Sequence, residues 1–355
     1  MPKKRVVLVA NTAWYLLNFR TNTIQQLLRE GFQVYCIVPD SSHVQELVSL
    51  GVTVKTFNLD NSSTNLIKEA ISLIELAFLI KGIDAFLVYS FNPKTNIYSL
   101  LSCGLLGVAC VPNVSGVGTA STLKGWKGFI YNKLLRISFR SATHIFFQNK
   151  DDMSSFSELG LLHGKSNECL PGSGVDLQRF QPSVVKESGS RAFLMASRLI
   201  EQKGVLDFLK AARSILDEGF EARFYLAGIV DRSNRGVSEE SIRSLLIPEK
   251  IVFLGEIRDM ALVMNNIDCV ILPSRYPEGV PRFLLEGLAS GKVLITTDAA
   301  GCRDTVSDRE NGFLIEPGSL QSLKDAIRKT LVLSEETFLK MKTCSRSLAE
   351  KKYDE

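Results

Sequence analysis

The sequence has few of the residue patterns that are typical of metal, disulfide or redox-cofactor sites. Its seven cysteines are scattered without a C-x-x-C pair, and its only histidines, His43, His144 and His163, lie outside any motif. No D-x-D triplet occurs, and no G-x-G-x-x-G follows an apolar run. These absences argue against a metal centre, a disulfide framework and a dinucleotide oxidoreductase, and they favour a reducing cytoplasm.

Apolar runs long enough to cross a membrane are also missing. Near the N-terminus a five-residue apolar run follows the basic residues 3–5, which is typical of a first strand and not of a signal peptide. Residues 95–123 carry no charged side chain, but their apolar part, 97–111, runs into Pro112 and falls short of the roughly 20 residues that a spanning helix needs. We expect a buried helix followed by a buried strand.

Acidic residues are absent between Asp84 and Asp151, where seven lysines and arginines occur. In residues 124–140 these cations interleave with aromatic and aliphatic side chains, a pattern that suits an anionic membrane surface. The residues expected at the inner face of the cytoplasmic membrane are Lys124, Trp126, Lys127, Lys133 and Arg136. The alternative is a solvated helix face that is basic. A nucleic-acid partner is not indicated, because the net charge is only +4 and no reading motif is present.

Short apolar runs alternate with helical patterns along the whole chain. Strands are expected at 5–10, 33–39, 52–57, 83–90, 108–114, 143–149, 191–197, 222–228, 251–256, 269–274 and 292–299. Amphipathic helices are expected between them, for example over 65–82 and 204–219. Near-continuous apolar strands separated by helices predict parallel sheets covered on both faces. The fold class is therefore α/β.

A stretch rich in Gly, Ser and Pro at 171–191 interrupts this alternation, and a fresh strand follows it. The sequence thus predicts two tandem doubly wound parallel-sheet, Rossmann-like domains, an N-terminal one over residues 1–178 and a C-terminal one over 188–355. Ligands of such sheets bind at the carboxyl ends of the strands, so we expect the site in the cleft between the domains.

Two glutamates stand eight residues apart in SRYPEGVPRFLLEGLASGK (274–292). Pro281 suits the first position of a helix that ends near Gly291. Glu278 then lies on the loop before the helix, and Glu286 lies about 7.5 Å along its axis. Carboxylates accept hydrogen bonds from sugar hydroxyls, and a helix N-terminus between them attracts phosphate. The spacing suits a nucleotide sugar, although such pairs also occur by chance.

Two cations follow the first strand of the second half, in ASRLIEQKG (196–204). Arg198 and Lys203 could bind a diphosphate and stabilise the charge that develops as it leaves. The alternative reading is an ordinary exposed loop between a strand and a helix.

These motifs together resemble the retaining glycosyltransferases of family 4, which have the GT-B fold. The resemblance rests on S-R-L-x-x-x-K-G, P-S-x-x-x-E-G-x-P-x-x-x-x-E, TTDAAGCRDTV and NGFLI in the second half. In the first half, NTAWYLLNFR, FNPKTNIYS, VPNVSGVGT, FFQNKDD and GSGVDLQRF are similar to the bacterial branch that extends lipid-linked intermediates of surface polysaccharides and glycans, lipopolysaccharide included. The chain departs from the family at Ser197, where glycine is common, and in lacking a Gly-Gly loop after the first strand.

The resemblance implies roles for individual residues. The residue matching Glu286 holds the nucleotide ribose, the one matching Glu278 holds hydroxyls of the donor sugar, and those matching Arg198 and Lys203 bind the diphosphate. The remaining donor-side candidates are Gly279, Val280, Arg282 and Gly116. The acceptor-side candidates come instead from the expected topology, in which the residues after the first strand face the cleft: Trp14, Tyr15, Asn18 and Arg20, with Lys94, Ser115 and Gly118. The Trp14 ring could instead pack against the first helix, and His144 reads as structural.

The resemblance implies a retaining transfer of a hexose or N-acetylhexosamine, UDP-linked in keeping with family habit, to a saccharide on polyprenyl diphosphate. It implies no cofactor and no metal, and a departing phosphate oxygen takes the acceptor proton. Two rival readings stay open at this point: a sugar-nucleotide epimerase on the same fold, and a non-catalytic membrane-surface binding module.

Overall fold

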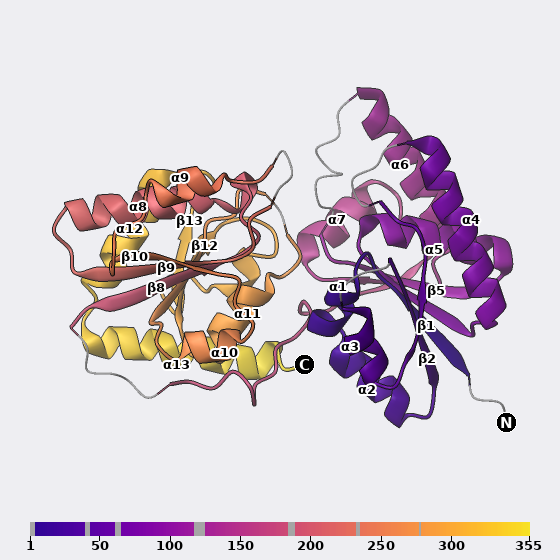
Figure 1. The fold of residues 1–355 in the computed structure, drawn as a ribbon, viewed down its shortest axis with the longest axis horizontal. Helices are drawn as coiled ribbons and strands as arrows, with labels where there is room; N and C mark the ends of the chain where they lie inside the picture. The colour runs from indigo at the N-terminus through magenta and orange to yellow at the C-terminus, as the bar shows by residue number, and fades with distance from the viewer. Residues whose placement is uncertain are drawn as a thin grey trace. The chain divides into compact units, whose positions relative to one another are not determined.

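The computed structural model of the protein describes residues 4–39, 43–60, 65–116, 125–183, 189–231, 235–276 and 278–355. The chain divides into two compact units, Met1–Ser173 and Gly174–Glu355. Each unit is built around its own parallel sheet, as Figure 1 shows. The prediction of two doubly wound α/β domains is therefore confirmed.

The first unit has a seven-stranded sheet in the order β3-β2-β1-β4-β5-β6-β7, in which every pairing is parallel. Its elements are β1 (Arg5–Val9), α1 (Ala13–Phe19), α2 (Thr21–Arg29), β2 (Gln33–Val38), α3 (Val44–Ser49), β3 (Thr53–Thr56), α4 (Leu66–Ile83), β4 (Leu87–Phe91), α5 (Pro93–Leu106), β5 (Ala109–Val114), α6 (Gly125–Phe139), β6 (His144–Phe147), α7 (Lys150–Glu158) and β7 (Ser166–Cys169).

Two hydrophobic clusters cover the two faces of this sheet. One cluster contains side chains of α4, α5 and α6, among them Leu76, Leu100 and Leu135. The other contains side chains of α1, α2 and α3. Helices on both faces explain why the strands read as continuous apolar runs, because both of their sides are buried.

The second unit has a six-stranded parallel sheet in the order β10-β9-β8-β11-β12-β13. Its elements are β8 (Arg191–Ala196), the short 3-10 helix η2 (Glu201–Lys203), α8 (Val205–Asp217), β9 (Ala222–Ala227), α9 (Glu239–Arg243), β10 (Ile251–Gly255), α10 (Met260–Met264), β11 (Cys269–Leu272), α11 (Arg282–Ala289), β12 (Val293–Thr297), η3 (Arg303–Thr305), β13 (Gly312–Ile315), α12 (Leu320–Leu331) and α13 (Glu335–Lys352).

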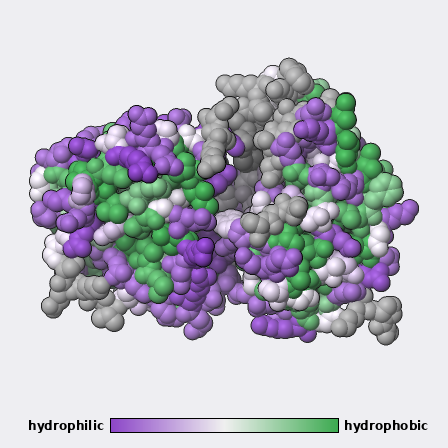
Figure 2. Space-filling model, in the orientation of Figure 1, coloured by the Kyte–Doolittle hydropathy of each residue, from purple (hydrophilic) through white to green (hydrophobic). Residues whose placement is uncertain are grey.

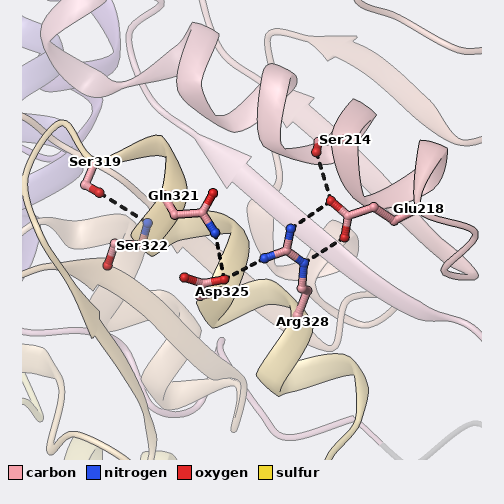
Figure 3. A network of polar contacts seen from close by, with 7 residues as sticks. All are labelled: Ser214, Glu218, Ser319, Gln321, Ser322, Asp325 and Arg328. Carbon is pink, nitrogen blue, oxygen red and sulfur yellow. Dashed lines mark hydrogen bonds and ion pairs between the residues drawn. The ribbon is translucent and has the colours of Figure 1, made fainter.

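A polar network ties two helices of the second unit together (Figure 3). The Arg328 guanidinium on α12 donates to both carboxylate oxygens of Glu218, which follows α8, at 2.7 and 2.8 Å. Ser214 adds a third hydrogen bond to that carboxylate at 3.0 Å. The hydrogen bond from Arg328 is the largest cause that lowers the pKa of Glu218, to about 2. The two-pronged geometry fixes how α8 and α12 pack.

All eleven predicted strands are present, and the structure has two more, β7 and β13, that were not predicted. β7 is a polar edge strand, Ser-Asn-Glu-Cys, with no apolar run to mark it, and β13 has only four residues. The uncharged stretch after Lys94 forms α5 and then β5, as predicted, and nearly all of α5 from Thr95 to Cys103 is buried. No helix in the described residues is both long enough and apolar enough to cross a membrane.

The prediction of an amphipathic helix over residues 65–82 is wrong for its outward face. Leu76 and Ile80 on α4 are buried, as an amphipathic helix requires. However, four large apolar side chains of the same helix are 54–72% exposed: Ile67, Ile71, Ile74 and Phe78. Figure 2 shows this hydrophobic surface in green over α4, at the right-hand edge of the view. We refer to these four residues as the α4 outer stripe.

Candidate active site

The candidate donor site lies at the carboxyl edge of the second sheet. β8 and β11 are neighbours there, although β9 and β10 come between them in sequence. In doubly wound sheets the crevice at such a switch point is where ligands bind. The loop after β8 carries Arg198 and Lys203, and the loop after β11 carries Glu278. The topology thus brings the predicted residues to one edge.

Three contacts hold these two loops against each other. Gly204 has φ +75°, and a Cβ on it would lie 2.3 Å from the carbonyl oxygen of Pro273, so only glycine fits there. The Arg275 backbone N–H donates to the Gln202 carbonyl at 2.7 Å. The Arg275 guanidinium also binds both carboxylate oxygens of the buried Asp207 on α8, at 2.9 and 2.7 Å.

The pair Arg275 and Asp207 was not predicted. The only sequence signal for Arg275 is its place directly after Ser274, within the stretch 274–292 that also contains the two predicted glutamates. Its partner stands 68 residues away, which the sequence alone does not reveal.

Lys203 and Glu278 form a buried ion pair between the two loops. The Lys203 ammonium donates to Glu278 Oε2, and the two side chains are 12% and 13% exposed. Burial by itself lowers the pKa of Lys203, but the Glu278 carboxylate and the neighbouring Tyr276 outweigh it, so the pKa lies above its ordinary value. Lys203 therefore keeps its positive charge at the edge of the sheet.

The loop after β12 forms the third side of the site. The Glu278 backbone N–H donates to the Ala300 carbonyl at 3.1 Å. Gly301 has φ +76°, and a Cβ there would lie 1.7 Å from the Gly279 carbonyl oxygen. The Thr297 hydroxyl donates to the Ser274 carbonyl at 2.8 Å. The position of the Glu278 backbone is thus fixed by neighbouring backbone and by glycine at a crowded point.

Helix α11 carries the second glutamate. Pro281 precedes the helix as its N-cap residue instead of opening it, one position earlier than predicted. Gly287 lets the helix lie close to β11, because a Cβ there would be 2.6 Å from Val270 Cγ2. Gly291, with φ +61°, follows the helix end as expected.

Glu286 is only 14% exposed and pairs with Arg282 one turn earlier, with 3.3 Å between Arg282 Nε and Glu286 Oε1. Burial raises the pKa of Glu286 to about 7, although Arg282 lowers it in part. Arg282 also lies 3.7 Å from the Glu355 carboxylate. Gly279 and Val280 are buried between the two glutamates.

Arg198 differs from these paired groups. Its side chain is exposed, and within the described residues it forms no ion pair. Of the four residues predicted here, Arg198 is thus an exposed cation without an ion pair in the described residues, Lys203 is a paired cation, and Glu278 and Glu286 are carboxylates. Such a set can bind an anion at the cations and hydroxyl groups at the carboxylates.

The first unit has its own switch point between β1 and β4. The Asn11 backbone N–H, just after β1, donates to Asn92 Oδ1, just after β4, at 3.1 Å. Trp14 on α1 is 44% exposed and its ring meets Phe19 edge-on at 5.6 Å. Tyr15 is half-buried, and Asn18 Nδ2 donates to the Trp14 carbonyl at 2.9 Å.

The other predicted residues of the first unit are dispersed. Arg20 is buried over the Phe91 ring. Lys94 is held by the Glu69 carboxylate at 2.7 Å and by the Asp60 carbonyl at 2.6 Å. Ser115 and Gly116 follow β5, with Gly116 at φ +95°. Gly118 lies outside the described residues.

Helix α6 contains most of the predicted membrane segment. Lys133 and Arg136 are exposed, and exposed apolar side chains lie beside them: Phe129, Ile130, Leu134 and Ile137. Lys124 lies outside the described residues, as do the side chains of Trp126 and Lys127.

Two family models match the chain. "Glycosyl transferases group 1" matches residues 177–345, and "Glycosyl transferase 4-like" matches residues 5–149. The chain is a GT-B glycosyltransferase. Both matches fall within one structural unit each, and together they span most of the sequence.

Curated relatives of this glycosyltransferase agree over most of their length. It is 27% identical over 353 residues to N,N'-diacetylbacillosaminyl-diphospho-undecaprenol alpha-1,3-N-acetylgalactosaminyltransferase of Campylobacter jejuni, covering 94% of this chain and 90% of the relative. It is 27% identical over 317 residues to UDP-Gal:alpha-D-GlcNAc-diphosphoundecaprenol alpha-1,3-galactosyltransferase of Escherichia coli, covering 85% and 80%.

Among solved structures, a glycosyltransferase from Rickettsia africae has a TM-score of 0.78 at 19% identity, covering 100% of this chain and 95% of that one. HepE of Anabaena in complex with UDP-glucose has a TM-score of 0.76 at 15% identity, covering 99% and 95%. These likenesses establish the GT-B fold.

Proposed function

We propose that this glycosyltransferase moves a hexose or N-acetylhexosamine, with retention of configuration, from a UDP-sugar to a saccharide on polyprenyl diphosphate. The reaction takes place at the inner face of the cytoplasmic membrane, in the synthesis of a surface polysaccharide or glycan. The names of the two curated relatives support the acceptor class, because both specify a sugar carried on diphospho-undecaprenol. The E. coli relative is also named for a UDP-sugar donor.

The observation that carries the proposal is the set of charges at the carboxyl edge of the second sheet. Arg198 and Lys203 supply two cations for a diphosphate, and Lys203 keeps its charge although it is buried. Glu278 and Glu286 supply acceptors on either side of the N-terminus of α11. A diphosphate flanked by a sugar and a ribose has donors and charge to match this set.

The chemical step follows from these groups. Cleavage of the bond between the sugar and the diphosphate leaves negative charge on the phosphate oxygen. The guanidinium of Arg198 and the ammonium of Lys203 stabilise that charge, which lowers the barrier. The acceptor hydroxyl attacks on the same face, and its proton passes to the departing phosphate oxygen. Glu278, whose Oε2 is held by Lys203, orients the sugar and has no covalent role in this step.

Membrane attachment through the first unit is part of the proposal. α6 exposes Lys133 and Arg136 beside apolar side chains, and the α4 outer stripe adds a second apolar surface. α5 packs against both α4 and α6, so the three helices form one layer. A layer with exposed apolar and cationic side chains suits the interface of an anionic bilayer.

The charges on α4 support the same orientation. Its two acids have partners outside the helix: Glu69 pairs with Lys94, and Glu75, which lies beside Ile71, Ile74 and Phe78, accepts from the Asn58 backbone N–H at 2.9 Å. Its lysines, Lys68 and Lys81, are exposed beside the stripe. One negative group of the helix is thus paired with a lysine of α5, and both of its own lysines are exposed.

The test is to incubate the full-length protein with a panel of UDP- and GDP-sugars and a polyprenyl-diphosphate-linked saccharide. Transfer requires both free nucleoside diphosphate and a lengthened lipid glycan. An altered sugar without release of nucleotide would mean an epimerase, and neither change with any donor would mean a binding module. Arg198→Ala, which removes one charge from the edge, should show strongly reduced transfer in the same assay.

A further inference from the structure

Arg20 is a buried cation that the proposed chemistry has not used. It lies between α1 and α2, is 7% exposed, and its Nε and Nη2 atoms are buried with no hydrogen-bond partner. Its guanidinium carbon lies 4.6 Å from the centre of the Phe91 ring. A ring face attracts a cation, but it does not accept all of the N–H hydrogen bonds that a guanidinium offers.

Arg20 is exceptional among the buried charged side chains of the described ranges. Asp207 binds Arg275, Asp152 accepts from Asn149 Nδ2 at 2.8 Å, and Lys292 donates to Ser183 Oγ at 2.9 Å. Arg20 forms no ion pair in the described residues, and two of its nitrogens lack a partner. Burial of a charged group whose hydrogen-bond donors lack partners is strongly unfavourable, so a guanidinium that is retained in this state indicates a partner that comes from outside.

The position of Arg20 supports a ligand. Phe91, under the guanidinium, is the last residue of β4, and Asn92 after it binds the Asn11 backbone just after β1. Arg20 therefore sits at the switch point of the first sheet, the place where open parallel sheets bind their ligands. It also precedes the first turn of the nine-residue helix α2, which has no side-chain cap. Arg20 is also the C-cap of α1, so the partial charges of the two helix ends oppose each other there, and the positive charge at this point is that of the guanidinium.

We propose that Arg20 forms an oxyanion site on the first unit that binds a phosphate group. The planar guanidinium fits the paired oxygens of a phosphate. In the reaction proposed above, on which this assignment of the source rests, the group is the diphosphate of the lipid-linked acceptor. The reaction brings two diphosphates to one enzyme, and the donor's is assigned to Arg198 and Lys203 on the second unit.

The experiment measures binding without turnover, so that it stands apart from the proposed reaction. Full-length protein is saturated with UDP to occupy the donor site, and inorganic pyrophosphate is then titrated by calorimetry. Arg20→Met should weaken pyrophosphate binding by roughly 10- to 100-fold, the loss expected for charge-assisted hydrogen bonds. The pyrophosphate affinity of Arg20→Lys should lie between those of the wild type and Arg20→Met, since lysine keeps the charge without the two-pronged geometry. Arg29→Met, at the exposed end of α2, is the matched control and should bind as the wild type does.

Two further ligands distinguish the sources of the phosphate. Farnesyl diphosphate should show the same dependence on Arg20 if the site takes a lipid-linked diphosphate. Nanodiscs of phosphatidylglycerol should show it instead if the site takes a membrane headgroup, which would keep the oxyanion site and overturn its assignment to the acceptor. If the enzyme transfers sugar, Arg20→Met should raise KM for the lipid acceptor and leave KM for the nucleotide sugar unchanged.

Thermal unfolding decides between a binding role and a structural one. Because Arg20→Met removes an unpaired buried charge, the variant should melt at or above the wild-type temperature in the absence of ligand. Unchanged pyrophosphate affinity in a folded Met variant would overturn the proposal. Loss of folding in both the Met and the Lys variants would overturn it too, since it would show that the guanidinium holds the unliganded protein together.

Discussion

The two sheets share the same strand order, apart from the extra edge strand β7, but they differ in the charged groups at their carboxyl edges. In the second unit the charged groups at the switch point are mostly paired within the protein, as in Lys203 with Glu278 and Arg275 with Asp207. In the first unit the switch point has the unpaired Arg20 and a half-exposed Trp14. The exposed apolar side chains of α4 and α6 also belong to the first unit.

Under the proposed function, the difference reflects how each unit obtains its ligand. A small soluble ligand gains affinity from a prearranged site, since little has to be ordered on binding. A lipid-linked ligand brings its own apolar surface and a membrane, so the protein surface that meets it remains exposed until then. The predictions below test this contrast.

The largest effect is expected from removing the cations of the membrane segment. The variant has four substitutions to glutamine, at Lys124, Lys127, Lys133 and Arg136. Each basic residue near an anionic leaflet contributes about 1 kcal/mol, so together they should change the partition coefficient onto anionic liposomes by up to roughly 1,000-fold. Co-sedimentation at low salt measures it, and high salt should release the wild type in part.

The matched control for that variant removes four exposed lysines of the second unit: Lys210, Lys329, Lys340 and Lys351. It should leave co-sedimentation nearly unchanged if attachment belongs to the first unit. A second variant, with serine at Ile71, Ile74 and Phe78 of the α4 outer stripe, should lose the part of binding that persists at high salt. Wild-type protein that ignores anionic liposomes at low salt would mean that both surfaces are only solvated faces.

The next largest effect is expected at the donor diphosphate. Arg198→Ala removes a charge aimed at the leaving phosphate, and loss of one such stabilising group costs about 100- to 1,000-fold in kcat. Arg198→Lys should recover part of the activity because the charge remains. Steady-state kinetics with saturating acceptor measure both variants. A fall in kcat below tenfold for Arg198→Ala would place the leaving group elsewhere.

The residues at the carboxyl edge of the second sheet were easier to predict from the sequence than the contacts that hold its loops in place. Glu278, Lys203 and the strands that carry them could be predicted, because motifs and apolar runs are local. The ion pair of Arg275 with Asp207 joins residues far apart in sequence, so it required the fold. The pattern over residues 65–82 predicts an amphipathic helix, and periodicity alone does not reveal that Ile71 and Phe78 stay exposed. β7 was missed because its residues are polar at an edge.

A smaller effect separates the two glutamates. Glu286→Ala should weaken both free UDP and the whole donor by about 10- to 100-fold, since the ribose hydroxyls occur in both ligands. Glu278→Ala should leave free UDP binding nearly unchanged and lower turnover by a similar factor. Calorimetry with UDP beside steady-state kinetics tests this. Equal losses of UDP affinity in both variants would mean that the carboxylates are assigned to the wrong ends of the donor.

The pKa of Glu286 predicts a pH dependence of about tenfold. Burial raises the pKa of Glu286 to about 7. If the ionised form binds the ribose, the ionised fraction rises from roughly one tenth at pH 6 to nine tenths at pH 8, so UDP affinity should rise about tenfold over that range. Glu286→Gln should remove this dependence. A wild-type affinity that does not change between pH 6 and 8 would exclude ionised Glu286 as the ribose ligand.

The smallest effect concerns Lys292, a buried cation of the second unit that contrasts with Arg20. Burial, and then the charge of Lys342, lowers the pKa of Lys292 to about 8. Its ammonium donates to Ser183 Oγ at 2.9 Å, and its carbonyl accepts from the Ser345 hydroxyl, so the residue belongs to the interior. We expect the buried charge of Lys292 to lower the stability of the folded protein and to bind no ligand.

Lys292→Met should therefore raise stability. Below about pH 8 lysine is charged in both the folded and the unfolded state, so the wild type carries the whole penalty of the buried charge there. As the pH rises from 8 toward 10.5, the folded protein releases the proton first, the wild type gains stability, and the advantage of methionine fades. The pKa shift of Lys292 limits the gain in the free energy of unfolding to about 3 kcal/mol. Because the protein around the charge relaxes, we expect a gain of about 1–2 kcal/mol at pH 7, or a few degrees in Tm. Thermal unfolding at pH 7 and pH 10 measures this gain in stability.

The affinities of Lys292→Met for UDP and pyrophosphate should not change, in contrast to Arg20→Met. A loss of either affinity would mean that Lys292 also serves a binding site.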